Sequence, residues 1–121
     1  MNNIIKEIEK YKLLNFNWDG EGGSVIDITS MKRATFFIES MYPIESMYPN
    51  EFESMLLANG NISLYYQDLI SYIELEFSNN KIIYYIRNGD DTYKGEVKFT
   101  GSMMPKELID ILHRNKVTNT T

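Results

Sequence analysis

The sequence predicts an α+β fold with two N-terminal helices, a four- to five-stranded antiparallel meander and a C-terminal helix, the helices lying on one face of the sheet. Apolar residues recur at helical spacing up to about residue 41 and again after Pro105, and they alternate in between. Turn-forming pairs separate the alternating segments, and connections this short favour antiparallel neighbours. A chain of 121 residues with 43% apolar content suits one core. We expect a single domain over 1–115 and a flexible tail over 116–121.

Three segments carry the helical spacing. In residues 3–14 the isoleucines recur at helical spacing among lysines and glutamates, which predicts an amphipathic helix. Asp27 or Thr29 can cap a second helix that ends near Met41. Pro105 opens the last helix, because proline suits a first helical turn. The face that the second helix is expected to bury consists of Ile28, Met31, Thr35, Ile38 and Met41.

Five short segments alternate with the period of a strand. They are residues 52–58, 61–66, 71–78, 81–87 and 93–100. The alternation gives the sheet one apolar face and one polar face that carries tyrosines. Asn59-Gly60 predicts a type I′ turn, because both central positions of that turn need positive φ. Asn79-Asn80 is a weaker signal of the same kind.

Composition excludes several classes of function. The chain has 12 basic and 17 acidic residues, and a net charge of −5 argues against nucleic-acid binding. It has no cysteine and one histidine, which removes thiolate chemistry and most zinc sites, so we expect no cofactor or metal. The longest apolar stretch, 82–86, is far shorter than the roughly 20 residues of a membrane span. Residues 1–10 do not resemble a signal peptide, so we expect a cytoplasmic protein.

Residues 38–43 and 44–49 are identical, each reading Ile-Glu-Ser-Met-Tyr-Pro. A perfect tandem hexapeptide indicates a local duplication within a loop, since solenoid repeats are longer. The two prolines that bracket the second copy prevent it from extending the helix. One interpretation is a neutral insertion. The other is that Met47 and Tyr48 add an apolar contact for a partner.

The segment 15–24 is rich in asparagine, glycine and other turn formers. Its first half matches the start of an EF-hand calcium loop, but the twelfth position is Ile26 instead of a glutamate. The structural interpretation is a capped turn in which Asp19 accepts backbone N–H groups and Trp18 docks onto the core. The functional alternatives are a partner contact through Trp18, Asp19 and Glu21, or a small-molecule or nucleotide site over 17–24. No Gly-Lys-Ser/Thr follows the glycines, as a phosphate loop requires.

Two further features could carry chemistry. Glu74 and Glu76 alternate onto one strand face about 7 Å apart, a separation compatible with a glycosidase pair and equally with a solvated sheet surface. His113 lies near the end of the last helix, where a cation is favoured, and the spacing gives it no orienting partner. We therefore expect His113 to be structural and the protein not to be an enzyme.

Nine tyrosines are many for this length. Tyr65, Tyr72 and Tyr84 are candidates for the polar sheet face, where tyrosines would form either a protein interface or cross-strand packing.

Two motifs together resemble a group of small bacterial and phage-borne proteins. They are Asn-Trp-Asp-Gly-Glu-Gly-Gly over 17–23 and Asn-Gly-Asn-Ile-Ser-Leu over 59–64, and the resemblance covers roughly 10–87. The chain departs from the group in its duplicated hexapeptide and in Tyr65-Tyr66, where a tryptophan is common. The group has no assigned reaction. The resemblance implies the same α+β layout and hints at toxin, immunity or anti-defence roles in mobile elements.

These observations predict a non-enzymatic protein-binding module of the inhibitor, immunity or anti-defence type. Its partner would be another protein, and a homodimer is left open. The expected partner-binding residues are Trp18, Asp19, Glu21, Met47, Tyr48, Tyr65 and Tyr72. The alternative is a small-molecule or nucleotide sensor that uses the glycine-rich loop 17–24.

Overall fold

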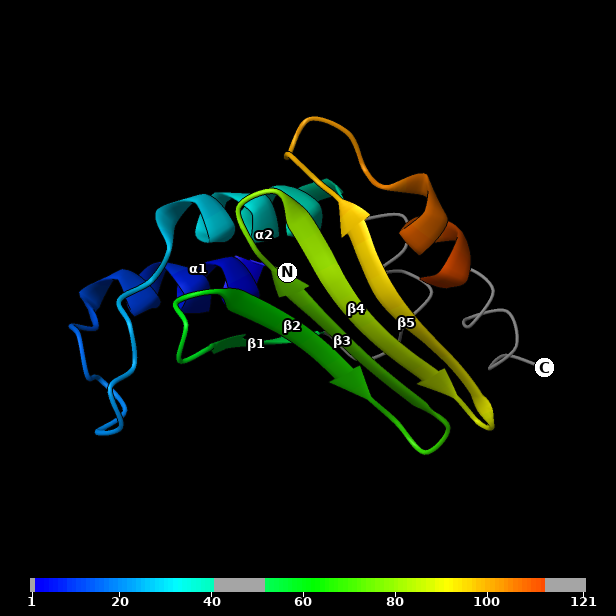
Figure 1. Ribbon diagram of the computed structural model, residues 1–121, viewed down its shortest axis with the longest axis horizontal. Coiled ribbons are helices and arrows are strands. Elements are labelled where there is room, and N and C mark those ends of the chain that lie inside the picture. Colours follow the sequence, from blue (N-terminus) through cyan, green and yellow to red (C-terminus); the bar gives the residue numbers. More distant parts are fainter. Residues whose placement is uncertain (1, 41–51, 113–121) are drawn as a thin grey trace.

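A computed structural model describes residues 2–40 and 52–112 (Figure 1). Its helical elements are α1 (Asn2–Lys10), a 3₁₀ turn (Tyr11–Leu13), α2 (Ile28–Ser40) and residues 106–112. Its strands are β1 (Glu53–Leu56), β2 (Ile62–Gln67), β3 (Ser71–Phe77), β4 (Lys81–Asn88) and β5 (Asp91–Lys98). The five strands form one sheet in the order β1-β2-β3-β4-β5, and every neighbouring pair is antiparallel. The expected α+β class with an antiparallel sheet is confirmed.

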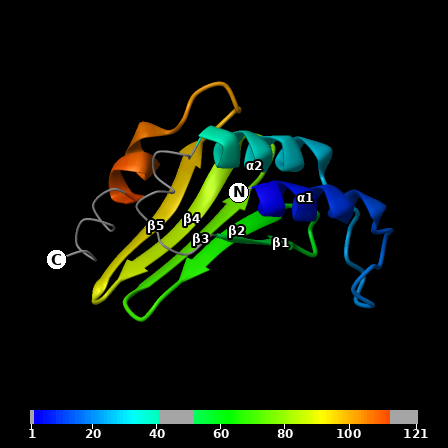
Figure 2. The same cartoon turned by 180° about the vertical axis from the view of Figure 1, so that it is seen from behind.

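Strand alternation places the core on one face of the sheet. β3 and β4 alternate strictly between buried and more exposed side chains. The largest fully buried strand side chains are Ile62, Leu64, Ile73, Leu75, Phe77, Ile82 and Ile86. They belong to the same core as α1, α2 and residues 106–112, which contribute Ile8, Phe37 and Leu108. The helices therefore pack on this face, as the two opposite views also show (Figures 1 and 2).

The helices differ in detail from their expected form. α1 ends at Lys10 and continues as the 3₁₀ turn, so the regular helix is shorter than 3–14. Of the two candidate caps of α2, Asp27 is the one used, and its Oδ1 accepts the Ser30 N–H at 3.0 Å. The expected face was wrong at Ile28, which is 46% exposed. Ile28 lies about 120° around the helix from Ala34, the centre of the buried stripe. That stripe consists of Ser30, Met31, Ala34, Phe37 and Ile38.

The β1–β2 connection is a hairpin, but the expected type I′ turn was wrong. Gly60 has a φ of +90°, whereas Asn59 does not have positive φ. The Gly60 N–H donates to the Leu57 carbonyl at 2.9 Å, and the Leu57 N–H donates to the Asn61 carbonyl at 2.9 Å. This is the pattern of a three-residue loop that ends in a glycine bulge.

Within the described ranges, none of the helices has both the length and the apolar character needed to cross a bilayer.

Candidate functional site

One face of the sheet is not covered by the described helices, and we call it the open face. It consists of every second residue of the five strands: Glu53, Met55, Ser63, Tyr65, Gln67, Tyr72, Glu74, Glu76, Lys81, Ile83, Tyr85, Arg87, Thr92, Lys94, Glu96 and Lys98. Three of its apolar side chains are exposed, namely Met55, Ile83 and Tyr85. The open face thus combines apolar, aromatic and charged groups on a rigid framework.

The strand register aligns the open face into rows. Glu53 pairs with Tyr65, Tyr65 with Glu74, Glu74 with Tyr85, and Tyr85 with Lys94. Directly opposed residues in antiparallel strands have Cβ atoms about 5 Å apart, so their side chains interact. One row therefore crosses all five strands and alternates carboxylates with phenol rings before it ends in a lysine.

Hydrogen bonds between phenols and carboxylates fix Tyr65 and Tyr72 of the open face. The Tyr72 hydroxyl donates to Glu74 Oε2 at 2.9 Å, and the Tyr72 and Tyr85 rings meet edge to face at 6.0 Å. A hydrogen bond to Glu53 raises the pKa of Tyr65. Burial, followed by the hydrogen bond to Glu74, raises the pKa of Tyr72. Both phenols therefore stay protonated as donors and hold their partner carboxylates in place.

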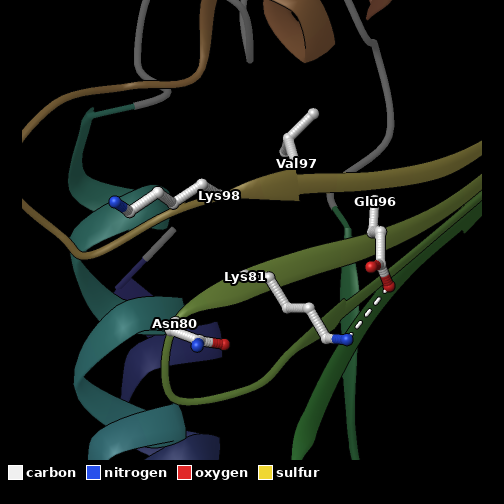
Figure 3. A pocket seen from close by; sticks show the side chains of 5 residues that line it. All are labelled: Asn80, Lys81, Glu96, Val97 and Lys98. Atoms are coloured by element: carbon white, nitrogen blue, oxygen red, sulfur yellow. Dashed lines mark hydrogen bonds and ion pairs between the residues drawn. The ribbon is translucent and has the colours of Figure 1, made fainter.

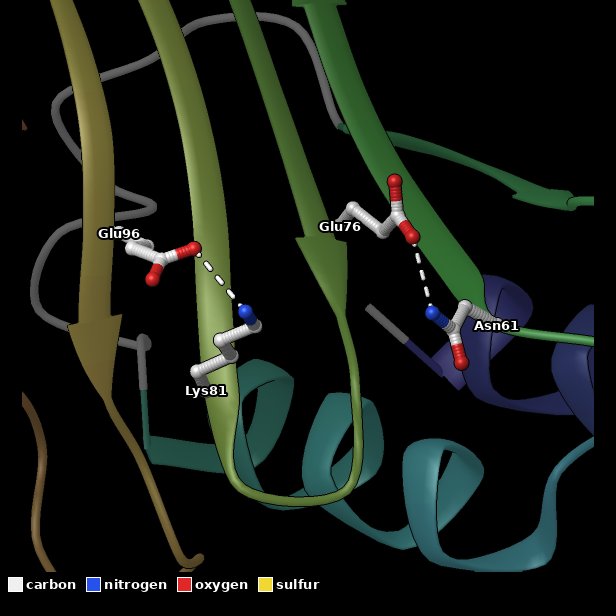
Figure 4. Close-up of polar contacts among 4 residues, drawn as sticks. All are labelled: Asn61, Glu76, Lys81 and Glu96. Carbon is white, nitrogen blue, oxygen red and sulfur yellow. Dashed lines mark hydrogen bonds and ion pairs between the residues drawn. The ribbon is translucent and has the colours of Figure 1, made fainter. Parts of the chain in front are cut away.

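The two glutamates considered as a catalytic pair are engaged by neighbouring side chains. Glu76 Oε2 accepts the side-chain amide of Asn61 at 2.8 Å (Figure 4). It also accepts the Asn59 amide at 3.1 Å, and Glu74 accepts the Tyr72 hydroxyl. Their partners are thus ordinary parts of a polar sheet surface. This arrangement favours the solvated-surface interpretation over glycosidase chemistry.

A shallow pocket lies at one end of β4 and β5. It is lined by Asn80, Lys81, Glu96, Val97 and Lys98 (Figure 3). The Lys81 ammonium and Glu96 Oε2 form an ion pair at 3.0 Å across it (Figure 4). Because these two charges satisfy each other, the pocket offers a small charged ligand little beyond Lys98.

The side chains of Asn17 and Asp19 bond to the backbone of their own loop, 17–24. Asp19 Oδ1 accepts the N–H groups of Glu21 at 2.9 Å and Gly23 at 2.8 Å, and these bonds lower the pKa of Asp19. Asn17 Oδ1 accepts the Gly22 N–H at 2.5 Å, and the Asn17 carbonyl accepts the Gly20 N–H at 3.0 Å. A phosphate or nucleotide would need these four backbone donors, and all four already have acceptors. The geometry favours the capped turn over a ligand or calcium loop.

Trp18 anchors the same loop to the body of the protein. Its indole N–H donates to the Ser24 carbonyl at 2.7 Å, and its ring is partly buried against the core. The Ser24 N–H in turn donates to the Ala58 carbonyl of the β1–β2 turn at 2.8 Å. The loop is therefore bonded to the hairpin at the end where β2 begins.

The structure brings together only some of the residues expected to bind a partner. Tyr65 and Tyr72 share the open face. Trp18 and Asp19 make hydrogen bonds within their loop, where the side chains of Asp19 and Glu21 are both exposed. The remaining expected residues, Met47 and Tyr48, lie outside the described residues, as do His113 and the tail 116–121.

The expectation for Tyr84 was wrong, and its neighbour takes its place. Tyr84 is only 7% exposed and lies on the helix-covered face, because it pairs with the buried Leu75. Tyr85 has the opposite orientation and is 37% exposed on the open face. The apolar run 82–86 conceals this alternation. Lys81 and Arg87 are an even number of residues from Tyr85 and so lie on the same face of the strand. Their charges could have identified Tyr85 as the tyrosine of the open face.

Among residues 2–40 and 52–112, His, Cys, Asp and Glu side chains do not gather in any group of three that could hold a metal ion.

No protein-family model matches this chain, and neither a curated protein nor a solved structure matches it. The resemblance to the Asn-Trp-Asp-Gly loop proteins stays a prediction.

Proposed function

We propose that this protein is a non-enzymatic protein-binding module that binds its partner through the open face. The observation that carries the proposal is the row Glu53–Tyr65–Glu74–Tyr85–Lys94, which crosses the whole sheet. Ordered tyrosines offer a partner a large contact area at low entropic cost. The exposed Met55 and Ile83 supply apolar contact beside the row.

The open face suits a partner better than the loop 17–24 does. Beside its hydrogen-bonded carboxylates, the open face carries the exposed side chains Met55, Ile83 and Tyr85 on rigid strands. In the loop, by contrast, Asp19 and Asn17 are occupied by backbone N–H groups. We therefore assign Trp18 and Asp19 a structural role and leave Glu21 as the one candidate contact of the loop. The backbone N–H groups of the loop already have acceptors, and this also argues against the small-molecule or nucleotide sensor.

The inhibitor, immunity or anti-defence class is the finer part of the proposal, and it is supported by the resemblance alone. Proteins of this kind act by covering a surface of a target, which requires a broad and rigid contact face. The open face suits that role, since it extends over all five strands of one sheet.

The test compares matched variants of the two surfaces. We expect Tyr72→Ala/Tyr85→Ala to lower capture of partner proteins by tagged bait at least about tenfold, because truncating central aromatic anchors costs several kcal/mol. Glu21→Ala should capture the same proteins as the parent chain. Circular dichroism establishes that both variants are folded. Loss of capture with Glu21→Ala, or full capture by the folded double variant, would overturn the assignment of the open face.

A further inference from the structure

The open face is divided by charge along the line between β3 and β4. Strands β1–β3 contribute three carboxylates to it and no basic residue, namely Glu53, Glu74 and Glu76. Strands β4 and β5 contribute four basic residues and one carboxylate, namely Lys81, Arg87, Lys94, Lys98 and Glu96. We call these two parts the acidic half and the basic half.

Neutral donors satisfy the acidic half. Glu74 accepts the Tyr72 hydroxyl, Glu76 accepts the Asn61 amide, and Glu53 is bonded to Tyr65. In the basic half, Lys81 pairs with Glu96 inside its own half. The carboxylates of the acidic half and the cations of the basic half therefore do not pair with each other, and both groups point away from the sheet.

We propose that the partner of the open face is a second copy of this chain, an inference that rests on the open face as a protein-binding surface; a target protein that used the same face would have to displace the second copy. A two-fold axis parallel to the strands, along the line between β3 and β4, turns one sheet over onto the other. This operation places the acidic half of each copy against the basic half of the other, and it makes both contacts identical. A two-fold axis across the strands would oppose like charges, so the charge division selects the first arrangement.

The row of alternating residues fits this arrangement. With β5 of the second copy over β2, Lys94 of the second copy lies over Tyr65, between the carboxylates of Glu53 and Glu74. A lysine ammonium is favoured both between two carboxylates and over a phenol ring. In the next row, Arg87 of the second copy lies over Tyr72. Face-to-face sheets pack in this aligned way with a rotation of about 30°.

The area that the open face can bury limits the affinity of the dimer. The axis between β3 and β4 overlaps the four strands β2–β5 of each copy. Four strands about 4.8 Å apart, with about seven residues of about 3.3 Å each, give a face of roughly 19 Å by 23 Å. Two such faces bury about 900 Å², below the roughly 1,200 Å² of stable specific interfaces and within the range of weak ones. The dimer is therefore weak, and its charged contacts make it sensitive to salt.

Charge reversal tests this arrangement directly. The acidic-half variant is Glu53→Lys/Glu74→Lys, and the basic-half variant is Arg87→Glu/Lys94→Glu. Each variant alone opposes like charges at both contacts, whereas a mixture of the two restores opposite charges at both. The control, Lys6→Glu/Lys32→Glu, changes the net charge as the basic-half variant does, but on exposed positions of α1 and α2.

The readouts are sedimentation velocity and energy transfer between labelled copies, with folding checked by circular dichroism. We expect the parent chain and the control to dimerise, and each reversed variant to be monomeric. An equimolar mixture of the reversed variants should form heterodimers. Raising the salt from about 25 mM to about 500 mM should weaken the parent dimer at least about tenfold. If a double variant does not fold, Glu74→Lys and Lys94→Glu repeat the test as single changes.

Three results would overturn the inference. They are a parent chain that stays monomeric, a dimer that the reversals leave unchanged, and reversed variants that fail to associate when mixed. A monomeric chain that still captures another protein through Tyr72 and Tyr85 would refute the second copy as partner and leave the proposed function standing.

Discussion

Gly60 packs directly against the backbone of Val25, so that a Cβ built on Gly60 would lie 2.6 Å from the Val25 carbonyl oxygen. The Gly60 carbonyl accepts the Asp27 N–H at 2.8 Å. Asp27 is also the cap of α2. The β1–β2 turn thus holds the segment that leads from the loop 17–24 into α2.

Gly60→Ala is expected to destabilise the protein by more than about 2 kcal/mol. An alanine at a φ of +90° is strained by about 1–2 kcal/mol, and its methyl group must displace backbone in addition. Gly89→Ala is the matched control, because Gly89 has a φ of +62° but open space around the new Cβ. Urea unfolding should give about 1 kcal/mol for the control. Equal losses for the two variants would contradict the close approach.

Ser30→Ala is expected to cost about 2 kcal/mol, although it removes only one buried hydroxyl. Ser30 Oγ donates to the Phe77 carbonyl and accepts the Ile62 N–H at 2.9 Å, so it bridges β2 and β3 from α2. The alanine leaves both backbone groups buried without that partner. Ser102→Ala is the control, since Ser102 is exposed. Thermal unfolding of the two variants tests the bridge, and a Ser30→Ala loss no larger than the control would refute it.

The sequence predicted the helices and strands of this fold well and their detailed contacts poorly. The alternation in 61–66 and 71–78 identified which alternate residues of these strands are buried, because a single buried face enforces a period of two. The turn at Asn59-Gly60 was misassigned, because its conformation depends on docking against Val25 and Asp27. A tertiary contact of this kind leaves no local pattern. The same holds for Ser30, whose partners are 32 and 47 residues away.

The candidate site was predicted in part. The sequence placed Tyr65 and Tyr72 on a polar sheet face, and the register confirms that placement. It did not predict the charge division, which depends on how β3 pairs with β4. It did identify Asp19 as an acceptor of backbone N–H groups, a role that two hydrogen bonds confirm. Local hydrogen bonding is readable from a loop sequence, whereas the composition of a surface needs the register of every strand.

Asp19→Asn is expected to loosen the loop 17–24 and to remove part of the acid dependence of stability. The backbone N–H groups of Glu21 and Gly23 lower the pKa of Asp19 below its usual 3.8. The carboxylate therefore stabilises the fold at pH values above 3.8, and this contribution is lost as the pH falls through the lowered pKa. The stability difference between parent and variant should shrink in that acid range. Trp18 is the only tryptophan, so its fluorescence reports the loop directly. A difference that does not change with pH would contradict this role.

Tyr11→Phe is expected to change stability at the opposite end of the pH scale. The Tyr11 hydroxyl donates to Glu7 Oε1 at 3.1 Å, and it lies 3.0 Å from Ser54 Oγ, which joins the 3₁₀ turn after α1 to β1. Burial is the main cause that raises the pKa of Tyr11 above 10.0. Its stabilisation is therefore fully present below pH 10.0 and is lost as the pH rises through the raised pKa.

At neutral pH the loss of this hydrogen bond in Tyr11→Phe should cost about 1 kcal/mol. Above about pH 10 the stability of the parent should fall toward that of the variant, because a partly buried phenolate beside Glu7 is unfavourable. Urea unfolding monitored by circular dichroism between about pH 9 and about pH 11 measures both curves. Parallel curves over this range would show that Tyr11 titrates alike in the folded and unfolded chains, and that the contact between the 3₁₀ turn and β1 does not depend on its proton.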